Sequence, residues 1–166
     1  MSNQKNLTIF RVFGGVGNQI FQYAYARSLS LSSKKKLVLD LSFYKNSLID
    51  YKRLKMAPSK YVLNNFKISK EIKIIKNCYT YSYPFYKYFL QYMPNFIKNF
   101  FFNTYKFKIQ KFVFEKLLFH KKKMNIKNEK NKTSYYLGYW QSIKYFKKIE
   151  KILKNDLQIK KKKNCF

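Results

Sequence analysis

Residues 13–24 read FGGVGNQIFQYA, and this stretch decides the fold that the sequence predicts. It contains three of the four glycines in the chain. A short apolar strand pattern over residues 7–13 precedes it, and Phe21, Tyr25 and Leu29 follow at helical spacing. We therefore expect the glycines to form a turn between a strand and a helix, which is where α/β proteins bind ligands.

The composition of this turn narrows the kind of ligand. Glycine tolerates positive φ and lets backbone N–H groups approach a ligand, and the first N–H groups of a helix favour an anion. The spacing is not the G-x-G-x-x-G of a dinucleotide loop, and no Gly-Lys-Ser/Thr ending of a P-loop is present. The residues alone predict a ligand-facing turn made of three glycines and two amides: Gly14, Gly15, Gly17, Asn18 and Gln19.

The remaining periodicities predict an α/β fold. A helix over residues 18–32 leads to a buried strand over residues 37–39, which makes a β-α-β unit with a parallel pair. Residues 44–70 read as loop, residues 79–83 as a strand and residues 107–119 as a helix. Residues 134–137 read as a strand, followed by a turn and by a helix from an N-cap at Ser142 to about Asn155.

Further candidate site residues follow the other predicted strands. Tyr139, Trp140 and Gln141 occupy the second strand-to-helix turn, and Trp140 fits either a core anchor or the lining of a cleft. Asp40 leaves the second strand, where a carboxylate caps a turn or contacts a ligand. His120 has no acidic neighbour and reads as a solvated helix end.

The net charge of +29 would fit a nucleic acid or an anionic membrane as partner. Only Arg11, Arg27 and Arg53 are arginines, whereas base readout and phosphate clamping favour arginine, so nucleic acid is disfavoured. Lysine is abundant together with asparagine, isoleucine, phenylalanine and tyrosine, which A/T-rich codons specify. Such a surface would still be attracted to anionic lipid headgroups.

Cysteines and carboxylates are sparse. Cys78 and Cys165 have neither metal-ligand nor disulfide spacing, and no Asp-x-Asp pair supports a divalent cation. At 166 residues the chain is expected to form one domain. No secretory signal and no apolar run of transmembrane length is visible, so the sequence predicts a cytoplasmic protein that can be peripheral on the inner face of the membrane.

Three segments resemble one family in the same order. The stretch at 13–24 resembles the N-terminal signature of the bacterial α-1,2-fucosyltransferases, glycosyltransferase family 11, which open with a strand, a Gly-Gly-x-Gly-Asn-Gln loop and a Phe-Gln-Tyr-Ala helix. Residues 39–44 (LDLSFY) and 138–142 (GYWQS) are similar to later segments of that family. The resemblance covers residues 7–157 and is thin between residues 70 and 130.

The resemblance implies an inverting, metal-independent transfer of L-fucose from GDP-fucose to the 2-hydroxyl of a terminal galactose, without a cofactor. It implies a GT-B enzyme whose Rossmann-like N-terminal half, here residues 1–157, forms the acceptor side, with a lysine-rich tail at residues 158–166. The acceptor would be a galactose-terminated glycan, and a lipid-linked glycan would suit a basic surface. Asn18 would be the catalytic residue; the residues implied to bind substrate are Gly14, Gly15, Gly17, Gln19, Asp40, Tyr139, Trp140 and Gln141.

The chain departs from the family in one element. The family's His-x-Arg-Arg-Gly-Asp segment, whose arginine neutralises the departing pyrophosphate, does not occur in it. We therefore expect a truncated fragment that lacks the GDP-fucose-binding domain and is inactive alone; the adenine-rich codons of residues 160–163 would favour a frameshift. Two alternatives stay open: a non-catalytic glycan-binding or complementing partner domain, and a basic nucleic-acid-binding module.

Overall fold

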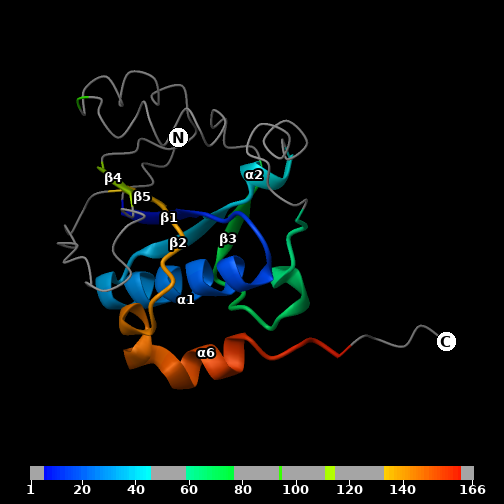
Figure 1. Ribbon diagram of the computed structural model, residues 1–166. Coiled ribbons are helices and arrows are strands. Elements are labelled where there is room, and N and C mark those ends of the chain that lie inside the picture. The colour runs from blue at the N-terminus through cyan, green and yellow to red at the C-terminus, as the bar shows by residue number, and fades with distance from the viewer. Residues whose placement is uncertain (1–5, 46–58, 77–93, 95–110, 115–132, 162–166) are drawn as a thin grey trace.

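The computed structural model describes residues 6–45, 59–76, 94, 111–114 and 133–161. These residues form an α/β fold, as the sequence predicts, with helices beside a parallel sheet of five strands in the order β3-β2-β1-β5-β4 (Figure 1). The strands are β1 (Leu7–Arg11), β2 (Lys36–Asp40), β3 (Lys73–Ile75), β4 (Lys111–Phe114) and β5 (Ser134–Leu137).

The centre of the sheet is β1, which pairs in parallel with β2 on one side and with β5 on the other. Ile9 is in register with Val38 and with Tyr135. Every residue of β1 is buried, including the polar Thr8 and the charged Arg11, as expected for a parallel strand covered on both faces. The predicted strands at residues 7–13, 37–39 and 134–137 are thus confirmed.

Helix α1 (Val16–Ser33) connects β1 to β2 and confirms the predicted helix. Its buried face includes Gln19, Tyr23, Ala26 and Ser30, spaced three or four residues apart as one side of a helix requires. The helix ends at Lys34, which adopts the left-handed conformation, with φ of 54°, that commonly terminates helices.

A second helix, α6 (Glu150–Asp156), lies against α1 on the side away from the sheet (Figure 1). The Tyr23 hydroxyl donates to Asp156 Oδ2 at 2.6 Å, and Arg27 Nε donates to the same oxygen at 3.2 Å. Burial, together with the bond to this carboxylate, raises the pKa of Tyr23 far above its usual value. Leu153 adds an apolar contact to the core, so α6 is anchored to α1 by both polar and apolar groups.

Two predicted helices are wrong in whole or in part. Residues 111–114, within the predicted helix 107–119, form strand β4, because pairing with β5 overrides the local helical spacing. The helix predicted to start at Ser142 is replaced by two 3₁₀ turns, η3 (Ile143–Tyr145) and η4 (Lys147–Ile149), before α6 begins at Glu150. The Ser142 side chain makes no capping bond.

The tighter turns have a packing reason. They bury Tyr145 beside Tyr25 and Trp140, with ring centroids 4.5 and 5.9 Å away, and leave Ile143 63% exposed. Ile152, on α6, is 38% exposed.

The segment after α6 also belongs to the fold. Lys67 N–H donates to the Gln158 carbonyl and Lys160 N–H donates to the Asn65 carbonyl, both at 2.8 Å, so residues 158–160 run beside η1 (Leu63–Asn65) and the residues that follow it. These residues were expected to be part of the lysine-rich tail. The predicted strand at residues 79–83 and His120 lie outside the described residues.

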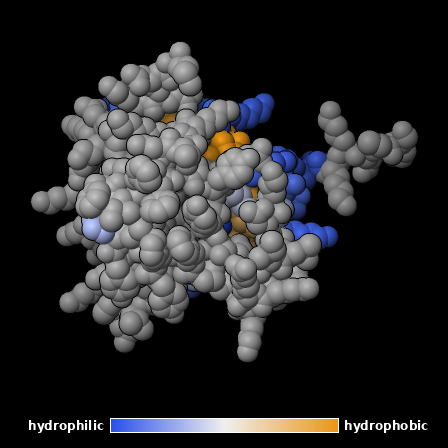
Figure 2. All heavy atoms as spheres, turned by 90° about the horizontal axis from the view of Figure 1, so that it is seen from above, coloured by the Kyte–Doolittle hydropathy of each residue, from blue (hydrophilic) through white to orange (hydrophobic). Residues whose placement is uncertain are grey.

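The surface seen from above is hydrophilic at one side of the molecule, next to a small hydrophobic area (Figure 2).

Within the described ranges, no helix has both the length and the apolarity needed to cross a bilayer.

Candidate functional site

The two predicted turns meet at the carboxyl edge of the sheet, where β1 and β5 lie side by side. Gln22 joins them from helix α1: Phe13 N–H donates to Gln22 Oε1 at 3.0 Å, and Gln22 Nε2 donates to the Gly138 carbonyl at 3.1 Å. Gln22 is fully buried. One side-chain amide therefore bonds a backbone group of each turn and holds the turns in fixed relation.

At the surface the turns meet through a second pair of amides. Gln141 Nε2 donates to Asn18 Oδ1 at 2.6 Å. Asn18 is half-buried and Gln141 is exposed. Among the described residues no hydrogen bond reaches Asn18 Nδ2 or Gln141 Oε1, so an amino group and a carbonyl oxygen of the pair remain available for further hydrogen bonds.

Gln19 has a different position from Asn18, although the two are adjacent in sequence. It is fully buried, and its Nε2 donates to the carbonyls of Gly14 at 2.9 Å and Lys60 at 2.8 Å. Its Oε1 accepts the Val62 N–H at 2.9 Å. The Gln19 amide, which was predicted to contact substrate, is thus hydrogen-bonded to backbone groups. These bonds connect the glycine turn to residues 60–62.

The three glycines of the first turn differ in their surroundings. Gly14 has φ of +78°, and a Cβ on it would lie 2.7 Å from Asn18 Nδ2. Gly15 and Gly17 are exposed, and a Cβ on either would meet nothing within 4 Å. Gly14 therefore allows the backbone to turn and leaves room for the Asn18 side chain beside it. Gly15 and Gly17 leave the outer surface of the turn open.

The second turn separates two adjacent aromatic residues. Tyr139 is half-buried at the surface, with its ring 4.9 Å from that of Phe13. Trp140 is fully buried, and its ring lies 4.7 Å from Tyr25 and 6.2 Å from Phe10. Of the two sequence interpretations of Trp140, the structure supports the core anchor, because its ring does not reach the surface.

The backbone of Trp140 makes this separation possible. Its φ of 57° is left-handed, a conformation that costs a bulky residue roughly 1–2 kcal/mol. It turns the chain between Tyr139 and Gln141, so that Trp140 enters the core while Gln141 stays beside Asn18. Burial of the indole offsets the backbone cost.

Asp40 lies inside the protein at the end of β2. The Tyr135 hydroxyl donates to Asp40 Oδ2 at 2.5 Å, and the Ser42 N–H donates to Oδ1 at 2.9 Å, at the start of α2 (Ser42–Lys45). Asp40 is fully buried, and burial raises its pKa even though the charge of Arg11 acts in the opposite direction. Its contacts are those of a turn cap, one of the two interpretations that the sequence left open, rather than the substrate contact that the family resemblance implied.

Sequence reasoning missed the supporting residues Arg11, Gln22 and Tyr135 as parts of this edge. Arg11 is in register with Asp40, and both are buried. For Gln22 a signal existed, because it lies three residues after Gln19 and therefore on the same face of α1. Within the described part of the chain, no group of three histidine, cysteine or carboxylate residues could hold a metal ion.

Comparisons of the chain with models of protein families, with curated proteins and with solved structures find no match. The class that the described geometry defines is an α/β protein with a neutral, amide-bearing pair of turns at the carboxyl edge of a parallel sheet, the edge where open α/β sheets bind ligands.

Proposed function

We propose that this chain is a protein of the α-1,2-fucosyltransferase family and that its two turns form the acceptor side of a fucosyl-transfer site. In this proposal the described fold corresponds to the Rossmann-like N-terminal half of a GT-B glycosyltransferase. The substrates are GDP-fucose as donor and a galactose-terminated glycan as acceptor, with no metal ion or cofactor.

The observation that carries the proposal is that the three segments resembling the family lie together. The Phe13 ring of the first segment is 5.9 Å from Phe43 in the second and 4.9 Å from Tyr139 in the third. The Tyr44 hydroxyl donates to the Gly14 carbonyl at 3.0 Å. Segments separated by about a hundred residues thus build one edge of the sheet, as a shared ligand site requires.

The exposed groups of this edge suit a sugar. A hydroxyl can accept from Asn18 Nδ2 and donate to Gln141 Oε1, and the nearby ring of Tyr139 offers an apolar surface. Asp40, the carboxylate closest in sequence to the first turn, is buried and bonded, so in our proposal the turns orient the acceptor rather than remove its proton.

In the reaction, the 2-hydroxyl oxygen of galactose attacks C1 of fucose from the face opposite the leaving group, and the hydroxyl proton passes to water or to a base outside the two turns. The C1–O bond to the diphosphate breaks, and GDP departs with the electron pair. The negative charge that develops on the diphosphate needs positive groups placed around it. We propose that groups outside the two turns supply them, because these turns are neutral.

The chain itself can be tested for acceptor binding. We expect a β-galactoside, titrated into isotope-labelled protein, to shift the side-chain amide resonances of Asn18 and Gln141. Asn18→Ala and Gln141→Ala should each weaken binding by roughly three- to tenfold, the value of one hydrogen bond. Asn155→Ala and Gln158→Ala are matched controls, because both residues are exposed and lie outside the two turns, in and just after α6. Absent galactoside binding, or equal losses in the controls, would contradict the proposal.

Catalysis needs a separate assay. We expect no transfer from labelled GDP-fucose to the galactoside by this chain alone, and transfer to the 2-hydroxyl when a polypeptide with the His-x-Arg-Arg-Gly-Asp segment is added. A glycan-binding domain without a catalytic role would bind the galactoside but support no transfer with any such partner. Fucose on another hydroxyl would contradict the assignment.

A further inference from the structure

A concave region lies at the opposite, amino edge of the sheet. An open cavity of about 1070 Å³ is lined by residues from the C-terminal half of α1 and from the beginnings of β1, β2 and β3. Most ionisable residues that line it are cations, and a single acid accompanies them: Arg27, Lys34, Lys35, Lys36, Lys73 and Glu71. The cavity is therefore strongly positive, unlike the neutral turns at the carboxyl edge.

Lysines beside the end of a helix often serve to bond its last carbonyl groups. In α1 several of these carbonyls already have other donors. The Leu29 carbonyl accepts the Ser33 hydroxyl at 2.6 Å, and the carbonyls of Ser30 and Leu31 accept the N–H groups of Lys35 and Lys34. The lysine ammonium groups are thus not required as caps for these three carbonyls.

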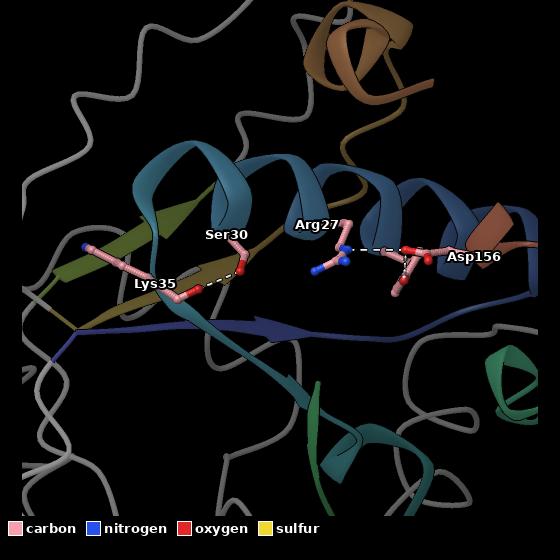
Figure 3. Close-up of polar contacts among 5 residues, drawn as sticks. Arg27, Ser30, Lys35 and Asp156 are labelled. Atoms are coloured by element: carbon pink, nitrogen blue, oxygen red, sulfur yellow. Dashed lines mark hydrogen bonds and ion pairs between the residues drawn. The ribbon is translucent and has the colours of Figure 1, made fainter. Parts of the chain in front are cut away.

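Ion pairing inside the protein accounts for only part of the positive charge. Arg27 Nε bonds Asp156, and Ser30 Oγ donates to the Lys35 carbonyl at the C-terminal end of α1, as Figure 3 shows. In the described part of the chain, neither Lys34 nor Lys36 forms an ion pair. Both are exposed, so their charges face solvent at the rim.

The interior of the cavity is partly apolar. Leu37 and Ile72 are buried core residues that contribute to its wall, and Leu31 is partly exposed on the helix side. A cationic rim around an apolar wall suits a ligand with a multiply charged phosphate group on a less polar body. The volume of about 1070 Å³ lies just above the range of about 300–1,000 Å³ typical of small-molecule sites.

We propose that this cavity binds a diphosphate or similarly phosphorylated group. Lysine ammonium groups are compact point charges that bind phosphate oxygens through charge-assisted hydrogen bonds. The site is separate from the two turns and does not depend on fucosyl transfer. The phosphorylated group can belong to a soluble ligand or to a lipid headgroup, and the experiment distinguishes the two.

The test uses the whole chain and inorganic pyrophosphate as the probe, with binding measured by calorimetry. The cavity variant is Lys34→Gln with Lys36→Gln. The control variant, Lys148→Gln with Lys151→Gln, removes the same charge from exposed lysines near and on α6. We expect the cavity variant to bind pyrophosphate about tenfold or more weakly and the control to bind like the wild type. Thermal unfolding of both variants verifies that the fold is retained.

A parallel arm measures cosedimentation with phosphatidylcholine vesicles that contain phosphatidylglycerol. If the cavity variant loses pyrophosphate binding and the control does not, the ligand is a soluble phosphorylated molecule. If the cavity variant loses only vesicle binding, the ligand is a lipid headgroup. Equal losses in the cavity and control variants, or no binding to either probe, overturn the proposal, because the net charge alone then explains the result.

Discussion

The carboxyl edge of the sheet contains two layers of side-chain amides with the same chemistry and different environments. In the inner layer, Gln19 and Gln22 are fully buried, and their amides bond backbone groups. In the outer layer, Asn18 and Gln141 bond each other at the surface. The comparison teaches that an amide near a glycine turn is not by itself a ligand contact, since the inner amides hold the turns and only the outer ones lie at the surface.

The largest effect is expected from the inner layer. Gln22→Leu keeps the approximate size of the side chain but removes the hydrogen-bonding partner of Phe13 N–H and of the Gly138 carbonyl. Two buried backbone groups then lose a bond, so we expect the free energy of unfolding to fall by about 2–4 kcal/mol in urea denaturation. Gln141→Leu is the control, and its stability should stay within about 0.5 kcal/mol of wild type. Equal stability of the two variants would erase the distinction between the layers.

The glycine turn provides the next test. In Gly14→Ala, the new Cβ lies 2.7 Å from Asn18 Nδ2 on a backbone with φ of +78°, so we expect a loss of about 1–2 kcal/mol and weaker galactoside binding. Gly15→Ala and Gly17→Ala have open space and serve as controls for stability. If calorimetry shows equal thermal stabilities for all three alanine variants, Gly14 does not set the position of the outer amide.

Asp40 makes the stability of the protein depend on pH. Its pKa is raised by burial in the folded state, so the folded protein binds more protons than the unfolded one. This contribution is fully present below the unfolded pKa of about 3.9 and is lost as the pH rises through the folded pKa. The stability of wild type relative to Asp40→Asn should therefore decrease with rising pH, by at most about 1.4 kcal/mol per pH unit.

Urea unfolding of both proteins from pH 4 to pH 8 measures this dependence. Glu150→Gln is the control, and the pH dependence of stability relative to this variant should have the opposite sign. The exposed Glu150 carboxylate bonds Lys154, which lowers the pKa of Glu150. A constant difference between wild type and Asp40→Asn over the whole range would contradict a raised pKa for Asp40.

The smallest effect on stability is expected from the outer layer. A double-mutant cycle of Asn18→Ala and Gln141→Ala should give a coupling of roughly 0.5 kcal/mol or less in urea denaturation, because the amides can bond water when unpaired. The same variants should lose galactoside binding, so function and stability separate in this pair. A coupling above about 1.5 kcal/mol would place the pair with the structural amides.

Local patterns predicted the elements whose residues alternate or repeat clearly. The strands around Ile9, Val38 and Tyr135 and the helix α1 were all expected, because their apolar residues face one core with a regular period. Strand β4 was expected to be helical, since its pairing with β5 depends on residues about twenty positions away. The 3₁₀ turns before α6 were missed because the packing of Tyr145 against Trp140 decides them.

The candidate site shows the same division. Asn18 and Gln141 were named from their positions after two strands, and the parallel pairing of β1 with β5 brings them together. Gln19 was grouped with Asn18 because the residues are adjacent, yet successive helical positions point about 100° apart, so one faces the core and the other the surface. Asp40 and Trp140 were placed near the ligand edge, and packing placed both inside.

The sequence by itself determined the α/β class, the strand-turn-helix at residues 7–33 and the second turn at residues 138–142, because these depend on local period and on glycine at turns. Only the tertiary structure decided which amides bond backbone and which face outward, and which end of the sheet gathers the lysine charges. The reason is that burial and hydrogen-bond partners come from residues far apart in the chain, which no local pattern records.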